Sequence, residues 1–329
     1  MLFRSQGQRP KLQVPLAPGD RNRALVAADR AGGAWVVLGA AGLHRWKPGT
    51  QPQRVEVPVF QGRTLRALFV DRSGYLWVGF DGGVVRLLNG VVSPAGFESG
   101  LDRMDVRLIF ESRSSEIWIG TAGEGVHRWD GSRFQTYGSA EGLSQRRIYA
   151  IHEDSQGRLW LGGERGLAVF EEGRFRALTK AHGLAENLIN DIFEDGAGRL
   201  WMSGIRGIHC VRSDDLNDWV ARRTDRIQSF SLGTDDGMAN TETNGESQPA
   251  GCKSGDGRLW FPTLQGIASF HPAEIVSSSP RPIAVIDGVT ADAVPQLGSS
   301  IQLFGSRNPI PEIRVAPHLR NSLTVRYGS

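Results

Sequence analysis

The sequence has few of the residues on which metal and redox sites depend. It contains 2 cysteines and 7 histidines in 329 residues, and no two histidines are clustered at a spacing typical of metal ligands. Neither a glycine-rich phosphate loop nor a nucleophile elbow is present. We therefore expect no metal site, no cofactor and no catalytic residue in this chain.

The net charge is also small, and long hydrophobic runs are lacking. The formal net charge is only +3 at pH 7, and the basic residues form no dense tract, which argues against nucleic-acid binding. No apolar run approaches the roughly 18 residues of a membrane span, and residues 1–20 lack the apolar stretch of a secretory signal. We expect no contact of this segment with a membrane.

Tryptophan, in contrast, recurs at a nearly fixed interval. The first five periodic tryptophans are 42, 41, 42 and 41 residues apart, and the sixth follows after 59. They are Trp35, Trp77, Trp118, Trp160, Trp201 and Trp260. A period of about 42 residues with one anchor aromatic per unit predicts a repeat array, in which we expect these side chains to be structural.

Each unit has the sequence pattern of a β-meander. Four units have Asp six residues before the tryptophan, as in Asp154, and five have Gly three residues before it, as in Gly157. This spacing predicts a tight turn between two strands, and a second glycine after the tryptophan separates a third strand. We predict an all-β fold: a β-propeller of six recognisable four-stranded blades over residues 20 to about 276, forming part of a seven-bladed ring.

Other segments depart from this repeat. SDDLNDWVARR predicts a short helix near residues 213–222, with Ser213 as its cap and Trp219 packed against the ring. Lys11–Leu16 has the pattern of the outermost strand of an incomplete blade. After Ser277–Ser279 the repeat ends, and RPIAVIDGVTADAV, IPEIRVAP and NSLTVRYGS predict strands of a truncated β-sandwich. We divide the chain into a propeller at 1–277 and a second domain at 278–329.

The repeat unit GLSQRRIYAIHEDSQGRLWLGGERGLAVFEEGRFRAL and its neighbour GLAENLINDIFEDGAGRLWMSG resemble the two-component regulator propeller family. The segment from DDGMANTETNGESQPAG to FHPAEI resembles its closing blade, and the strands after it resemble the start of an Ig-like triple-tyrosine domain. Some units depart from the pattern: Ser112 and Ser115 replace the turn pair of the third, and Pro262 stands at a glycine position of the sixth.

This resemblance implies the ligand-sensing, periplasmic (extracytoplasmic) part of an inner-membrane receptor, dimeric in its full length. It also implies that the natural chain continues beyond Ser329 into a transmembrane helix and a histidine kinase or diguanylate cyclase. The segment itself would then not be an enzyme.

Candidate binding residues gather on the loops that lead into the innermost strands and on those between second and third strands, which share one face of a propeller. These loops are rich in arginine, whose fork of donors suits carboxylate or sulfate groups. We predict that a small anionic molecule or an oligosaccharide binds there. The candidate residues are Arg66, Arg107, Arg147, Tyr149, Asn187, Asn190, Arg165, Arg206 and Asn244. Alternatively, the arginines pair with carboxylates of neighbouring blades.

Two further function classes stay open: a propeller enzyme, such as a lyase or glycosidase, and a protein-interaction scaffold. An enzyme needs two titratable groups that converge on one substrate, whereas this face is rich in arginine. Cys210 and Cys252 lie in consecutive repeats. A disulfide between them is conceivable in an oxidising compartment, but we expect two buried thiols.

Overall fold

A computed structural model describes residues 24–39, 42–93, 101, 103–245 and 248–275, and strand segments at 285–291, 294–295, 301–302 and 323–328. The chain divides into two compact units, Met1–Glu274 and Ile275–Ser329. The strand predicted at Lys11–Leu16 lies outside the described residues.

The first unit consists of six antiparallel sheets, each built from consecutive strands, which we call blades 1 to 6. Blades 1 to 3 comprise β1 (Ala24–Ala28), β2 (Ala34–Leu38), β3 (Leu43–Trp46) and β4 (Gln53–Arg54); β5 (Leu65–Val70), β6 (Leu76–Phe80), β7 (Gly83–Leu88) and β8 (Val91–Ser93); and β9 (Val106–Glu111), β10 (Ile117–Thr121), β11 (Val126–Trp129) and β12 (Phe134–Tyr137). Blades 4 to 6 comprise β13 (Ile148–Glu153), β14 (Leu159–Gly163), β15 (Gly166–Glu171) and β16 (Arg174–Leu178); β17 (Asp191–Glu194), β18 (Arg199–Gly204), β19 (Gly207–Arg212) and β20 (Ser229–Leu232); and β21 (Cys252–Lys253), β22 (Leu259–Thr263) and β23 (Gly266–Phe270).

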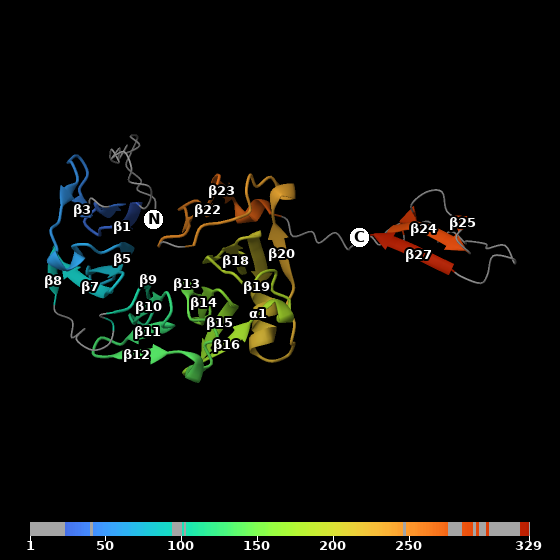
Figure 1. The fold of residues 1–329 in the computed structure, drawn as a ribbon, viewed down its shortest axis with the longest axis horizontal. Helices are drawn as coiled ribbons and strands as arrows, with labels where there is room; N and C mark the ends of the chain where they lie inside the picture. The colour runs from blue at the N-terminus through green and yellow to red at the C-terminus, as the bar shows by residue number, and fades with distance from the viewer. Residues whose placement is uncertain are drawn as a thin grey trace. The chain divides into compact units, whose positions relative to one another are not determined.

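The blades follow one another in chain order around a ring (Figure 1). The first strand of each blade is innermost, and β1, β5, β9, β13 and β17 each lie beside the next in this series. Five blades have four strands, and the sixth has three among the described residues. The predicted all-β propeller is therefore confirmed.

The Asp–Gly–Trp pattern closes the hairpin between the first two strands. In blade 4, Asp154 Oδ1 accepts the backbone N–H of Arg158 at 2.9 Å, and Oδ2 accepts the indole N–H of Trp160 at 2.8 Å. The same indole-to-carboxylate bond forms in blades 2 and 5, at 2.7 and 2.8 Å. The repeated spacing thus couples the turn to its anchor side chain in these three blades.

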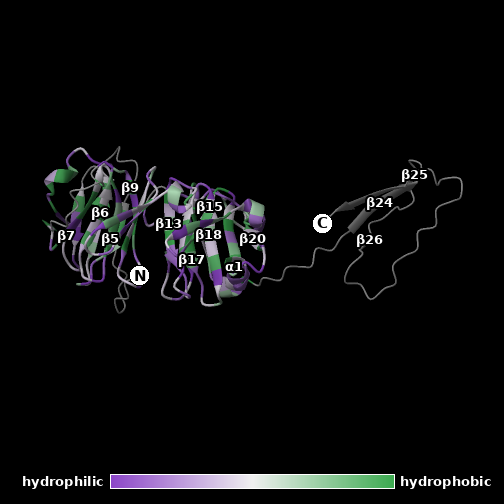
Figure 2. Ribbon diagram, turned by 90° about the horizontal axis from the view of Figure 1, so that it is seen from below, coloured by the Kyte–Doolittle hydropathy of each residue, from purple (hydrophilic) through white to green (hydrophobic). Residues whose placement is uncertain are grey.

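The anchor tryptophan of blade 4 also joins its blade to the next one. Trp160 is fully buried and belongs to one hydrophobic cluster with Ile189, Ile192 and Met202 of blade 5 or its leading loop. Close approach of the blades depends on Gly162, because a Cβ there would lie 2.6 Å from Cγ2 of Ile189. Hydrophobic residues accordingly occupy much of the strands, and hydrophilic residues many of the loops (Figure 2).

One α-helix, α1 (Ser213–Val220), occurs among the described residues, as predicted. Leu216 and Trp219 on it are buried, and the Arg176 guanidinium lies 3.8 Å from the Trp219 ring centroid. The predicted cap is wrong: Arg212 is the N-cap, in an extended conformation without a side-chain capping bond. Ser213 is instead the first helical residue, and its N–H donates to the Gly198 carbonyl at 2.8 Å.

Short 3-10 helices occur in the connections: η2 (Pro58–Phe60), η3 (Ser139–Glu141), η4 (Lys180–His182), η5 (Thr234–Asp236) and η6 (Pro272–Glu274). None of the helices in the described part of the chain is long and apolar enough to cross a membrane.

The strands described in the second unit form an antiparallel sheet. β24 (Val285–Ala291) pairs with β25 (Val294–Pro295), β26 (Ile301–Gln302) and β27 (Leu323–Gly328). The predicted boundary at 277/278 and the assignment to a triple-tyrosine domain stay predictions.

Candidate functional site

Three of the predicted binding residues occupy equivalent β-bulges. The cross-strand register shifts around Arg66 in β5, Arg107 in β9 and Tyr149 in β13, so each is the extra residue of its strand. Each stands eleven residues before its anchor tryptophan. Bulges turn a side chain away from the regular pleat and are common beside functional sites.

The two bulge arginines share one carboxylate. Arg66 Nε lies 2.6 Å from Asp105 Oδ1, and Arg107 donates from Nε and Nη2 to Asp105 Oδ2 at 3.1 and 2.9 Å. Their side chains are 18 and 19% exposed. The alternative prediction, that the arginines pair with carboxylates, therefore holds for Arg66 and Arg107. Because two guanidinium groups share one carboxylate, this cluster has a net charge of +1.

The remaining predicted arginines are more exposed. Arg147 Nε lies 3.9 Å from Glu164 Oε2, with 60% of the Arg147 side chain exposed, so this ion pair is loose. Arg165 and Arg206 are exposed on the turns between second and third strands. These three side chains are accessible on the loops where the sequence predicts binding.

Two of the predicted asparagines bind the protein's own loops. Asn187 Oδ1 accepts the Lys180 N–H at 2.9 Å. Asn190 is buried, and its Nδ2 donates to the Thr243 carbonyl at 2.8 Å. Asn244 is exposed, and its backbone N–H donates to the Pro262 carbonyl at 3.0 Å. Asn187 and Asn190 thus have structural contacts.

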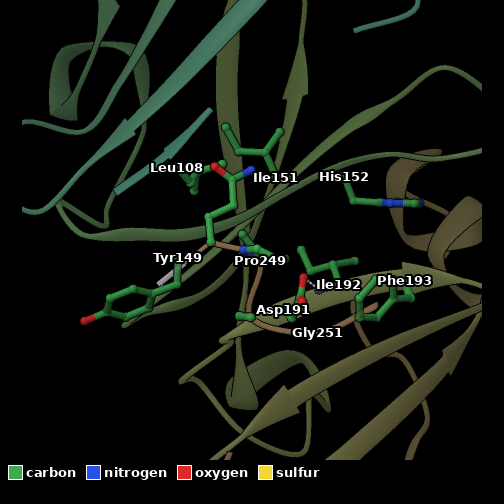
Figure 3. Close-up of a pocket in the computed structure, with 12 residues that line it drawn as sticks. Leu108, Tyr149, Ile151, His152, Asp191, Ile192, Phe193, Pro249 and Gly251 are labelled. Atoms are coloured by element: carbon green, nitrogen blue, oxygen red, sulfur yellow. Dashed lines mark hydrogen bonds between the residues drawn. The ribbon is translucent and has the colours of Figure 1, made fainter. Parts of the chain in front are cut away.

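Two cavities lie along the innermost strands. The smaller, of about 230 Å³, is lined by residues of β9, β13 and β17 and by residues 248–251 (Figure 3). The larger, of about 850 Å³, is lined by residues of β1, its following turn and β5. Gln248 and Pro249 line both cavities, so this segment separates them. Of the nine predicted residues, Tyr149 lines the smaller cavity.

Gln248 fixes this segment to the inner edge of blade 3. Its Oε1 accepts the Ile109 N–H at 2.8 Å, and its Nε2 donates to the Ile109 carbonyl at 2.7 Å. The side-chain amide thereby pairs with the backbone of β9 as a neighbouring strand would, 139 residues away in the sequence.

We expect Gln248→Ala to accelerate hydrogen exchange at the Ile109 amide and to lower the free energy of unfolding by about 1–2 kcal/mol, since two hydrogen bonds are lost. Amide exchange followed by NMR measures both effects. Gln135→Ala, on the exposed part of β12, is the matched control and should leave exchange at Ile109 unchanged. Equal protection of Ile109 in Gln248→Ala and the native protein would contradict the assigned bonding.

Asp191 is a cavity residue that the sequence reasoning missed. It stands ten residues before Trp201, where every other blade has an apolar residue: Leu25, Ala67, Leu108, Ala150 and Ala250. Asp191 Oδ1 accepts the Ile192 N–H at 2.9 Å, but burial raises the pKa of the carboxyl to about 7. Aligning the repeats on their tryptophans would have revealed this exception.

Burial favours the uncharged form of two titratable residues at this cavity, His152 and Cys252. Burial lowers the pKa of His152, an effect that Glu194 partly opposes, and burial raises the pKa of the Cys252 thiol. Cys252 is exposed and Cys210 is buried, and neither forms a disulfide. The expectation of two buried thiols is therefore correct for Cys210 and wrong for Cys252.

Blade 5 also contains a chain of side chains that resembles a hydrolytic triad. His209 Nδ1 lies 3.0 Å from Ser231 Oγ, and its Nε2 lies 3.0 Å from Glu186 Oε2. The same cross-strand pairing recurs in blade 3, where His127 Nδ1 lies 2.9 Å from Thr136 Oγ1. The histidine–hydroxyl pair thus also occurs in blade 3, where no carboxylate bond to the histidine accompanies it. We therefore interpret the His209–Ser231 and His127–Thr136 pairs as structural.

No group of three or more potential metal ligands occurs in the described part of the chain. In blade 1, His44 Nδ1 lies 3.1 Å from the Gly42 carbonyl. Burial lowers the pKa of His127 to about 4, which keeps its ring neutral at pH 7. The histidines that recur in these three blades are thus engaged in contacts within their own blades.

Comparison with known proteins supports the family resemblance. Residues 142–165, which contain the first two strands of blade 4, match the family model of the two component regulator propeller. The match confirms the resemblance predicted from the repeats. A search among curated proteins gives no match.

Solved structures share the fold at low sequence identity. The extracellular domain of a protein described as the hybrid two component system BT3049 of B. thetaiotaomicron matches 93% of this chain, with a TM-score of 0.68 and 20% identity. This chain covers 41% of that structure. An inactive variant of virginiamycin B lyase from Staphylococcus aureus, in a structure with quinupristin, has a TM-score of 0.56 and 17% identity over 76% of this chain and 81% of the lyase. PorZ from Porphyromonas gingivalis has a TM-score of 0.55 and 12% identity over 92% of this chain and 51% of PorZ.

Proposed function

We propose that this chain is part of the extracytoplasmic sensor of a transmembrane signalling receptor. The match of residues 142–165 to the two component regulator propeller carries this proposal, and the fold shared with the BT3049 extracellular domain supports it. The chain spans 41% of that structure, so the properties of the whole receptor are proposals as well. We propose a periplasmic sensor, a receptor homodimer, and a histidine kinase or diguanylate cyclase output.

The proposed ligand of the loop face is a small anionic molecule or an oligosaccharide bearing acidic groups. Arg66 and Arg107 carry one more positive charge than Asp105 neutralises. Arg147, directly before the first strand of blade 4, is exposed. A guanidinium group can bind a carboxylate or sulfate through two parallel hydrogen bonds. Binding would then act on signalling through its different affinity for two receptor states.

The enzyme alternative has less support. Virginiamycin B lyase shares the propeller at 17% identity, which carries over the fold but no activity. Acid–base catalysis requires two titratable groups at one substrate, whereas Arg66 and Arg107 are paired with a single carboxylate. We therefore favour a sensor that does not transform its ligand.

Isothermal titration calorimetry with glucuronate and with a sulfated disaccharide tests the loop face. We expect the variant that combines Arg66→Ala and Arg107→Ala to lose binding by about tenfold or more, because the bidentate donors are removed. Lysine at both positions should recover only part of the affinity, since the charge returns without the planar fork.

Arg133→Ala is the matched control, because Arg133 is an exposed arginine on the turn between β11 and β12. It should bind as the native protein does. Absence of heat with both probes, or the same affinity in the double variant, would show that the Arg66–Asp105–Arg107 cluster serves only the structure of the ring.

A further inference from the structure

Blade 5 has a pair of polar residues at a place where the blades before it are apolar. Asp191 faces Ser203 across β17 and β18, whereas the corresponding pairs are Ala67 with Gly79, Leu108 with Gly120, and Ala150 with Gly162. Ser203 is 0% exposed, and its Oγ has no hydrogen-bond partner. A polar group buried without a partner is costly, so packing alone does not explain Ser203.

The smaller cavity has one carboxyl group in its wall and no permanently cationic side chain. No lysine or arginine is among its lining residues, and Asp191 is the lining carboxylate. Asp191 Oδ1 receives one backbone N–H, while a Cβ at Gly251, another lining residue, would lie 3.0 Å from Oδ2. The second oxygen is therefore directed towards the side of the cavity formed by residues 248–251.

Aromatic side chains accompany this carboxyl group. Tyr149 and Phe193 line the cavity with Asp191 and lie on either side of it in the view of Figure 3. The Tyr149 ring extends away from Asp191 in this view, whereas a Cβ at Gly251 would lie 3.0 Å from Asp191 Oδ2 and 3.1 Å from Phe193 Cε2. A carboxylate beside an aromatic ring is a combination that attracts ammonium groups, through charge and through the ring quadrupole. Burial lowers the pKa of His152 on β13 and raises that of the Cys252 thiol on β21, and both shifts favour the uncharged form. Beyond His152, Glu194 Oε2 lies 3.9 Å from its Nε2, and Asp154, Arg113 and Lys253 are further charges that act on its ring.

We propose that the cavity formed by Tyr149, Asp191, Phe193 and residues 248–251 binds a small organic cation through an ammonium group. Its volume of about 230 Å³ suits a molecule with few heavy atoms. The ammonium group supplies the positive charge that the lining residues lack, and the Asp191 carboxylate neutralises it. This site shares Tyr149 with the residues predicted for the loop face, but its charged group is Asp191, whereas the anionic ligand is proposed to bind the arginines.

Titration of the protein with tetramethylammonium and with methylammonium chloride, followed by NMR shifts of the Tyr149 and Phe193 rings, tests the site. Binding requires the ionised carboxylate, whose pKa is about 7. The affinity should therefore rise about tenfold between about pH 6 and pH 8. Potassium chloride at equal ionic strength controls for screening.

Asp191→Asn and Asp191→Ala should both remove saturable binding; the first keeps the shape of the side chain and the second introduces the residue of neighbouring blades. Asp130→Asn, on the exposed turn of blade 3, should bind as the native protein does. Equal binding in either Asp191 variant, or no saturable shift with either ammonium salt at about pH 8, overturns the proposal. Glucuronate binding should be unchanged in Asp191→Asn, so this site and the proposed loop-face function can fail separately.

Discussion

Trp160→Ala is expected to lower the free energy of unfolding of the propeller by about 3–5 kcal/mol. The indole is fully buried, and it fills the space between blades 4 and 5 with Ile189 and Met202 around it. The substitution leaves a cavity between two sheets and also removes the N–H that Asp154 Oδ2 accepts. Asp154 itself is 3% exposed, so its lost donor adds to the cost.

Urea unfolding monitored by circular dichroism measures this loss. Trp260→Ala is the matched control from the same repeat position, because Trp260 is 36% exposed and its indole donates to Ser254 Oγ, an uncharged acceptor. We expect it to cost no more than about half as much as Trp160→Ala. Similar losses in the two variants would show that burial between blades does not determine the contribution of the anchor tryptophans.

The fold could be predicted from sequence because its main determinants are local and repeated. The bond from Trp160 to Asp154 spans six residues, and the turn glycine Gly157 has a φ of 80° that favours glycine. The same turn pattern recurs in several blades. Its repetition predicts the fold more strongly than one occurrence of the pattern would. The cap at Ser213 was mispredicted because a contact with Gly198, distant in sequence, fixes the chain there instead.

The site could be predicted only in part. The position eleven residues before each tryptophan marked Arg66, Arg107 and Tyr149, which the structure places at equivalent bulges. The sequence could not show that Asp105 pairs with both arginines, because Arg66 and Asp105 meet only when two blades pack together. Equally, the contact of Gln248 with Ile109 joins the segment before blade 6 to the innermost strand of blade 3, and it leaves no periodic signal in the sequence.

The Asp191 carboxyl in the smaller cavity is expected to make the stability of the protein depend strongly on pH. The pKa of Asp191 is about 7 in the folded protein, whereas an aspartate in an unfolded chain has a pKa of about 3.9. Between these values the folded state holds a proton that the unfolded state has released, so stability falls as pH rises. The loss should be complete above about pH 7 and amount to as much as about 4 kcal/mol.

Asp191→Ala should therefore be more stable than the native protein by about 1–3 kcal/mol at about pH 8, and nearly equal to it at about pH 4, where the folded carboxyl is neutral. The hydrogen bond to the Ile192 N–H is lost in the variant, which offsets part of the gain. Urea unfolding at a series of pH values measures the difference. Leu108 and Ala150 show that an apolar residue fits the corresponding position of a blade. A stability difference that does not change with pH would show that the Asp191 carboxyl titrates normally, and it would leave the proposed ammonium site without its charged group.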